Sequence, residues 1–104
     1  MIRNVVTVTL ALTLALAAAG DAATPRVQIR QFKFVPVQLT VPVGATVTWT
    51  NGDEETHTVT ATDRTYTSTG LEHAETFTHR YTQAGTYTYF CALHPHMTAT
   101  VVVR

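Results

Sequence analysis

The chain has 104 residues, with seven basic and seven acidic side chains, so its formal net charge is zero. The sequence contains no cluster of lysine and arginine that would attract nucleic acid or anionic lipid, and we expect neither as a partner. Its single cysteine excludes an internal disulfide, and its length allows one small domain.

The first 23 residues have the features of a secretory signal peptide. Arg3 precedes an apolar, uncharged run that ends at Ala19, and small residues follow it. The run is shorter than the ~20 apolar residues that span a bilayer, so we expect cleavage rather than retention as a membrane anchor. We therefore divide the chain into a signal peptide, residues 1–23, and a mature periplasmic domain, residues 24–104, with no membrane contact after cleavage.

Beyond residue 24 the sequence alternates with the period of β-strands, and Pro or Gly residues separate the runs. The first run slips in phase between Ile29 and Phe32, which indicates a β-bulge. Residues 63–75 are irregular and leave room for a short turn or helix. The expected strands cover residues 27–34, 46–50, 56–62, 76–81, 87–91 and 97–103. The pattern predicts a single all-β domain, an antiparallel β-sandwich with Greek-key connections.

Side chains outside any chemical motif are divided between the core and the solvent. The acidic run at residues 53–55 is interpreted as a solvated loop tip in preference to a docking patch. Six aromatic residues are expected in the core: Phe32, Phe34, Trp49, Phe77, Tyr87 and Tyr89. Three histidines receive no metal role: His73 as a solvated loop residue, His79 as a hydrogen-bonded core or edge residue, and His96 as a residue of the ligand loop whose side chain points away from the metal.

Three potential metal ligands of different kinds lie within seven residues: the thiolate of Cys91, the imidazole of His94 and the thioether of Met97. A second imidazole, His57, reaches the same point if its strand neighbours the one that ends at Cys91. Thiolates and thioethers favour Cu(I), and imidazoles suit both copper states. Two His, one Cys and a weak axial Met therefore define a mononuclear electron-transfer copper site. A lone thiol in an exported protein is a reactive liability unless it is occupied, which fits the same interpretation.

These motifs resemble those of the cupredoxins, the type I blue copper proteins, over nearly the whole mature chain. The short Cys-x-x-His-x-x-Met loop is most similar to that of amicyanin, whereas plastocyanin and pseudoazurin usually have a longer gap between His and Met. The resemblance implies that Asn51 braces a loop and that the Thr58 backbone N–H donates to the Cys91 sulfur. The ligands that it implies for one copper ion are His57, Cys91, His94 and Met97.

We expect a monomeric, soluble one-electron carrier that meets protein redox partners transiently, and the amicyanin-like loop suggests a c-type cytochrome and a dehydrogenase. Storage or delivery of copper without electron transfer is the alternative, although such proteins more often use several Met and His residues in flexible segments. An enzyme is not expected, because a multicopper oxidase needs histidines beside the cysteine, where Phe90 and Ala92 stand. Structural zinc is disfavoured because Met is a poor zinc ligand.

Overall fold

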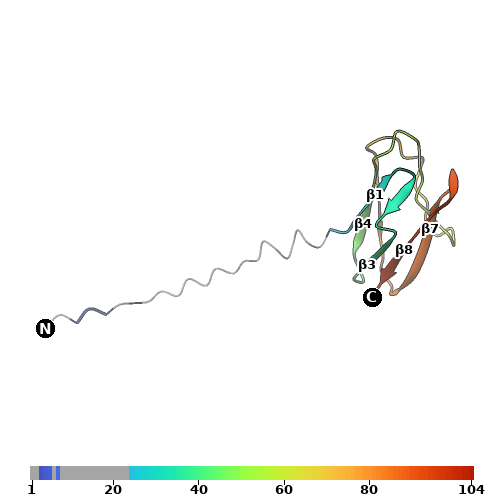
Figure 1. Cartoon of the computed structure of the whole chain (residues 1–104). Helices are drawn as coiled ribbons and strands as arrows, with labels where there is room; N and C mark the ends of the chain where they lie inside the picture. Colours follow the sequence, from blue (N-terminus) through green and yellow to red (C-terminus); the bar gives the residue numbers. More distant parts are fainter. Residues whose placement is uncertain (1–2, 6, 8–23) are drawn as a thin grey trace.

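The computed structural model describes residues 3–5, 7 and 24–104 (Figure 1). Most of the predicted signal peptide, residues 1–23, therefore lies outside the described residues, and the division of the chain at residue 24 stays a prediction. In the part of the chain that is described, no helix is long and apolar enough to cross a membrane.

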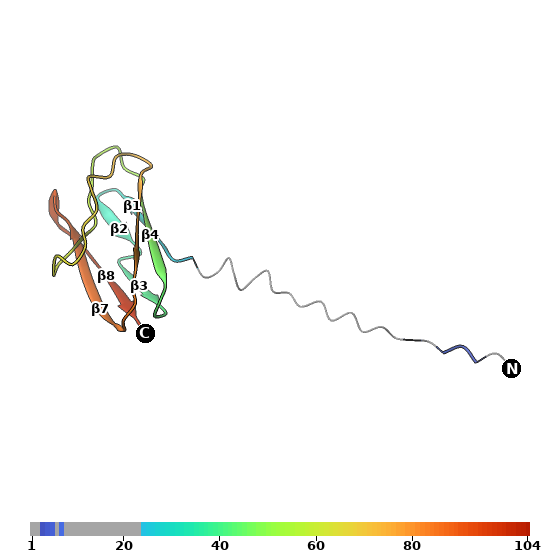
Figure 2. The same cartoon turned by 180° about the vertical axis from the view of Figure 1, so that it is seen from behind.

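Within residues 24–104, eight strands form two four-stranded sheets that pack against each other (Figures 1 and 2). One sheet has the order β2-β1-β4-β6 and the other β3-β8-β7-β5. Consecutive strands from β2 to β7 alternate between the sheets. The predicted single-domain, all-β sandwich is therefore confirmed. The strands are β1 (Arg26–Arg30), β2 (Lys33–Val35), β3 (Gln38–Val41), β4 (Thr46–Asn51), β5 (Thr60–Ala61), β6 (Thr76–Arg80), β7 (Gly85–Cys91) and β8 (His94–Val103).

Each sheet contains one parallel strand pair, so the prediction of wholly antiparallel sheets needs correction. Strand β1 runs parallel to β4, and β3 runs parallel to β8, whereas the other pairs of named strands are antiparallel. Parallel neighbours require a long crossover connection. Here the chain between β1 and β4 passes through β3 of the opposite sheet, and it returns in its original direction.

The phase slip between Ile29 and Phe32 is a tight turn, and the prediction of a β-bulge is wrong. Gln31 and Phe32 join β1 to β2, and Arg30 pairs with Lys33 across them. Their φ angles are 52° and 59°, in the left-handed region that two-residue hairpins usually fill with Asn-Gly. A residue with a Cβ atom costs about 1–2 kcal/mol there, so contacts from elsewhere must hold this turn.

The core lies between the sheets and contains five of the six predicted aromatic side chains. Trp49 and Tyr89 come from opposite sheets, are almost completely buried, and meet edge to face with ring centroids 5.4 Å apart. Phe34 packs against Tyr89 in the same manner at 4.7 Å. Phe77 of β6 and Tyr87 of β7 are partly buried and pack against this core. The exception is Phe32, which is 42% exposed and therefore does not belong to the core.

Candidate metal centre

The predicted ligands of the second sheet come from the hairpin of β7 and β8. Cys91 ends β7 and His94 begins β8, so only Ala92 and Leu93 separate the two strands. The strand register shifts between Phe90 and Cys91, and Cys91 then pairs with His94. The expected ligand loop is therefore a tight turn, and it fixes both side chains on the rigid backbone of a hairpin.

His57 reaches the same end of the sandwich from a shorter strand than expected. The predicted strand at residues 56–62 is reduced to β5, which pairs with β7 at Thr60 and Phe90. His57 lies just before it and forms an isolated bridge with Leu71, with N–O distances of 3.1 and 2.7 Å. This bridge substitutes for a continuous strand, because residues 63–75 fold back along the chain instead of pairing regularly.

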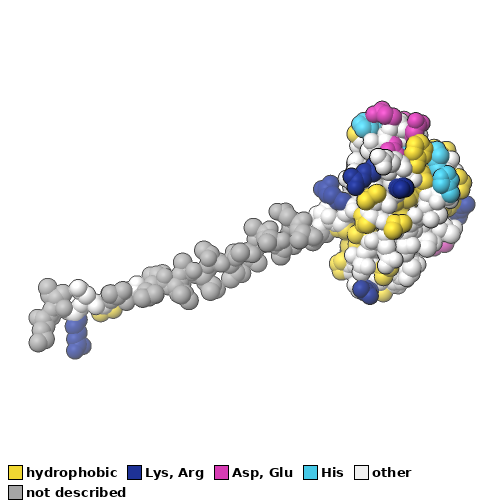
Figure 3. All heavy atoms as spheres, in the orientation of Figure 1, with side chains coloured by type: hydrophobic (Ala, Val, Ile, Leu, Met, Phe, Trp, Pro, Cys, Tyr) yellow, Lys and Arg dark blue, Asp and Glu magenta, His cyan; other side chains and the backbone are white. Residues whose placement is uncertain are grey.

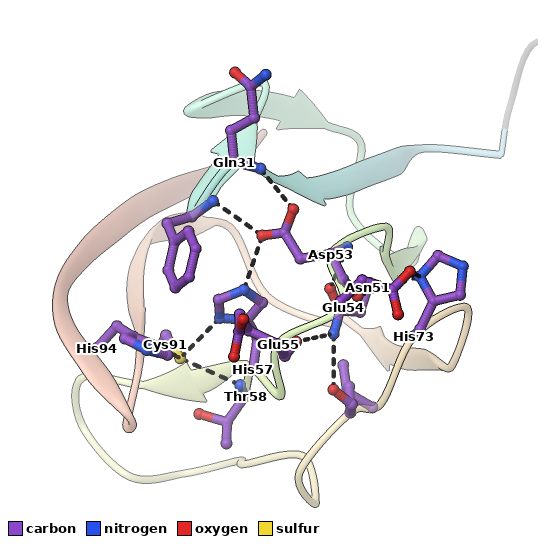
Figure 4. A network of polar contacts seen from close by, with 12 residues as sticks. Gln31, Asn51, Asp53, Glu54, Glu55, His57, Thr58, His73, Cys91 and His94 are labelled. Carbon is purple, nitrogen blue, oxygen red and sulfur yellow. Dashed lines mark hydrogen bonds and ion pairs between the residues drawn. The ribbon is translucent and has the colours of Figure 1, made fainter.

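The donor atoms of His57, Cys91 and His94 converge on one point (Figure 4). The Cys91 Sγ atom lies 3.7 Å from His57 Nδ1 and 3.6 Å from His94 Nδ1, and all three atoms lie within 4.8 Å of one another. A single ion with bonds of about 2.3 Å to sulfur and 2.05 Å to nitrogen, at angles near 110–120°, places sulfur and nitrogen about 3.6–3.8 Å apart. The spacing therefore fits one shared ion.

The three side chains differ in exposure, and the fourth predicted ligand, Met97, is buried in the core. Cys91 and His57 are fully buried, whereas His94 is partly exposed. Met97, three residues after His94 on β8, is 4% exposed and belongs to the same buried cluster as Cys91. One thiol and two imidazoles, with a buried thioether three residues further along β8, are donor types that suit copper.

Thr58 makes the hydrogen bond to sulfur that the sequence predicts, and it adds a second contact. Its backbone N–H donates to Cys91 Sγ over 3.4 Å. Its Oγ1 accepts a hydrogen bond from the backbone N–H of Ala92 at 2.8 Å. A donor to sulfur stabilises the thiolate, which is the form that binds metal. Thr58 thus connects the segment of His57 to the hairpin turn of Cys91.

Asn51 braces the loop before His57, as predicted. Its buried side-chain amide donates to the carbonyl oxygens of Glu55 and Leu71, both at 2.8 Å. Its Oδ1 accepts the backbone N–H of Asp53 at 2.9 Å. One side chain therefore satisfies three backbone groups on both sides of His57 and fixes the path of the chain there.

Asp53 belongs to the site, and its interpretation as part of a solvated loop tip is wrong. Its carboxylate accepts the backbone N–H groups of Gln31 at 2.6 Å and Phe32 at 2.9 Å, and it lies 2.9 Å from His57 Nε2 (Figure 4). Its side chain is only 13% exposed, whereas Glu54 and Glu55 are exposed as expected.

Burial alone would raise the pKa of Asp53, but the N–H donors of Phe32 and Gln31, together with His57, outweigh it and hold the pKa below its ordinary value. The ionised carboxylate accepts from His57 Nε2, which leaves the Nδ1 lone pair directed at Cys91. An acidic residue four positions before a candidate imidazole ligand was an available signal, because carboxylates often orient metal-binding histidines.

The other three histidines lie outside this group. His73 is exposed and His96 is exposed on β8, as predicted. His79 is partly buried, and its ring stacks on Tyr66 with centroids 4.0 Å apart. Among the described residues, the candidate metal-binding group of histidine, cysteine and acidic side chains contains His57, Cys91 and His94.

The partial burial of His79 makes the stability of the metal-free protein sensitive to pH. Burial lowers the pKa of His79 below its ordinary value of 6.5. The native state therefore binds this proton less readily than the unfolded chain, and His79 contributes stability above about pH 6.5 that is lost as the pH falls through the lower native pKa.

We expect the variant His79→Phe, which keeps a ring against Tyr66, to lose less stability than the wild type between pH 7 and pH 5. Urea unfolding of the two metal-free proteins measures this difference, with the exposed His73→Gln as the control. Identical pH dependence in His79→Phe and the wild type contradicts the assignment.

The fold and the donor set together define a small β-sandwich protein with a mixed nitrogen and sulfur metal centre. The sequence matches the Cupredoxin-like domain family over residues 4–103, and the chain belongs to this family. Amicyanin-alpha of Methylorubrum extorquens is 30% identical over 90 residues, which cover 82% of this chain and 76% of that protein. Amicyanin of Paracoccus denitrificans is 32% identical over 83 residues, which cover 75% of this chain and 63% of that protein.

Solved structures give the same result. A purple cupredoxin from Nitrosopumilus maritimus has a TM-score of 0.74 at 29% identity and covers 77% of this chain and 99% of its own. A mutant amicyanin in its Cu(I) form has a TM-score of 0.73 at 31% identity, and the match covers 78% of this chain and 82% of that one. A copper-containing nitrite reductase from Thermus scotoductus has a TM-score of 0.73 at 28% identity, and only 22% of that chain is matched. The resemblance to cupredoxins, and to amicyanin among them, is confirmed.

Proposed function

We propose that the chain is a type I copper protein that carries one electron at a time between protein partners. The observation that supports this most strongly is the convergence of one thiol and two imidazoles within 4.8 Å in a chain of the cupredoxin-like family. The proposed ligands of one copper ion are His57, Cys91, His94 and Met97. Bound copper supplies a one-electron Cu(II)/Cu(I) couple, and no enzymatic activity is proposed.

Each proposed ligand has a different role. His57 is fully buried and oriented by Asp53, so it anchors the site to the scaffold. Cys91 provides the thiolate, which the Thr58 N–H stabilises. Met97 provides the weak axial sulfur. Because the ligands are held on a β-hairpin and a braced loop, they move little between oxidation states, which suits rapid electron transfer.

His94 is the proposed electron port, because it is partly exposed while the other nitrogen ligand is buried. Leu93, which is 54% exposed, and the exposed Pro95 give this end of the hairpin an apolar surface. Figure 3 shows apolar and histidine side chains beside the acidic end of the domain. A small surface of this kind suits the transient association of redox partners. The similarity to amicyanin suggests a c-type cytochrome and a dehydrogenase as the class of partners.

We also propose that the chain is exported to the periplasm, with residues 1–23 removed and residues 24–104 forming the working domain. The apolar N-terminal run and the copper chemistry of an unpaired thiol support this location. N-terminal sequencing of protein recovered from the periplasm tests it, and a mature protein that begins at Met1 contradicts it.

The copper function is tested by adding Cu(II) to residues 24–104. We expect an intense visible thiolate-to-copper absorption that ascorbate bleaches and an oxidant restores. His94→Ala should lose this absorption, whereas His96→Ala, which changes an exposed histidine of the same strand, should keep it. A colourless protein that binds Cu(I) and gives it up readily to chelators contradicts the proposal and favours copper storage or delivery.

A further inference from the structure

The ring of Phe32 lies against both imidazoles of the candidate centre. Its centroid is 5.1 Å from that of His57 and 5.0 Å from that of His94, with interplanar angles of 89° and 86°. The two imidazole rings are themselves 5.1 Å apart. Phe32 therefore meets both rings in the edge-to-face geometry that aromatic pairs prefer, and it restricts how each of them can turn.

This position is unfavourable for phenylalanine by itself. The side chain is 42% exposed, and its backbone has a φ of 59°, where glycine or asparagine is preferred. The turn does not require a large apolar side chain there, and the part of the ring that is buried packs against the two imidazoles. A strained conformation that the surrounding contacts maintain is a recurring property of functional sites.

Asp53 supplies the hydrogen bonds that maintain the left-handed turn of Gln31 and Phe32. The same carboxylate accepts the N–H groups of Gln31 and Phe32 and holds His57 Nε2 (Figure 4). The turn that carries the aromatic ring and the buried imidazole are therefore fixed to one group. Asp53 is 22 positions from Gln31 and 21 positions from Phe32 in the sequence, so these two hydrogen bonds are tertiary contacts.

Phe32 also lines a surface groove of about 390 Å³, together with Val37, His96 and Met97. Cys91 is fully buried and does not line this groove. We propose that Phe32 caps the metal centre: its ring separates the groove from the Cys91 thiol and holds the His94 ring, and Asp53 positions the cap relative to His57. Both are positioning residues.

The cap is tested first in the metal-free protein, where Cys91 is the only cysteine and its reaction with a thiol reagent such as DTNB gives one signal. Phe32→Gly removes the ring and accepts the left-handed backbone, so the fold is kept. We expect labelling about tenfold faster, the factor that corresponds to ~1.4 kcal/mol, which lies within the range for two edge-to-face contacts.

Gln31→Gly is the matched control, because it relaxes the neighbouring left-handed residue, φ 52°, without removing the ring. Its labelling rate should equal that of the wild type. Phe32→Leu should restore part of the protection, and Asp53→Ala should accelerate labelling. Equal rates in Phe32→Gly and the wild type, or equal acceleration in Phe32→Gly and Gln31→Gly, overturn the cap. An unchanged rate in Asp53→Ala overturns the role of Asp53.

A second measurement uses the copper-loaded protein, and only this part rests on the proposed function. The rate at which a Cu(I) chelator removes the metal should rise about tenfold in Phe32→Gly and stay unchanged in Gln31→Gly. Faster thiol labelling in a protein that binds no copper overturns the copper function and leaves the cap standing. Copper binding with unchanged labelling and unchanged metal removal overturns the cap and leaves the copper function standing.

Discussion

Replacement of Cys91 with serine is expected to abolish the visible absorption of the copper-loaded protein and to weaken copper binding more than any other single change. The Sγ atom lies 3.6–3.7 Å from both imidazole Nδ1 atoms, so it faces the same point as both nitrogen donors. A hydroxyl is a hard donor that stays protonated, whereas copper in both oxidation states binds a thiolate well. The loss of affinity should exceed the roughly 10–100-fold that removal of an outer hydrogen bond to a metal ligand costs.

This effect can be separated from a loss of folding. Serine is close in size to cysteine, and its oxygen can still accept the N–H of Thr58. The metal-free Cys91→Ser protein should therefore unfold with a free energy within about 1 kcal/mol of the wild type. Absorption spectra measure the predicted loss of the visible band, and competition with a copper chelator measures the predicted loss of copper affinity. An intense absorption that survives Cys91→Ser excludes a thiolate-copper centre at this position.

Replacement of Asn51 with leucine is expected to produce a large loss of stability, although Asn51 is not a proposed ligand. Leucine has a similar volume, but it removes the side-chain hydrogen bonds to the carbonyl oxygens of Glu55 and Leu71 and to the N–H of Asp53. The Leu71 carbonyl then keeps only the backbone N–H of His57. At about 1 kcal/mol for each lost hydrogen bond, the unfolding free energy should fall by ~3 kcal/mol. For a domain of this size that corresponds to a decrease in Tm of roughly 12–24 °C.

The control for Asn51→Leu lies in the same loop. The Thr56 hydroxyl donates to the Glu72 carboxylate at 2.9 Å, but this contact is exposed. Thr56→Ala should therefore change the unfolding free energy by no more than about 0.5 kcal/mol. Thermal and urea unfolding of both metal-free variants test the comparison. Similar stabilities for Asn51→Leu and Thr56→Ala contradict the role of Asn51 as the brace of the His57 loop.

The sequence predicted those parts of the fold that depend on local alternation. The runs around Trp49, Phe77 and Tyr89 form strands β4, β6 and β7, because each alternates side chains between the core and the other face of its sheet. The donor types also indicated a metal centre, since a thiol, two imidazoles and a thioether have few common uses, and copper stays a prediction. The structure brings His57, Cys91 and His94 together as the motif indicated.

The missed features depend on contacts between distant segments. Alternation says which face of a strand is buried and nothing about the direction of its neighbour, so the parallel pairs were missed. Gln31-Phe32 lacks the Asn-Gly signature of a two-residue turn, because its left-handed conformation is supported by Asp53 from more than 20 residues away. The same hydrogen bonds make Asp53 part of the site, although its neighbours Glu54 and Glu55 are exposed as expected.

The central claim is that four side chains hold one copper ion that gains and loses a single electron while it stays bound. Voltammetry of copper-loaded residues 24–104 tests this claim most directly, because it follows the same molecule through both oxidation states. We predict one reversible, one-electron wave that persists over repeated cycles and is absent from Cys91→Ser. An irreversible wave, or copper lost to solution upon reduction, contradicts the assignment of the protein as an electron carrier.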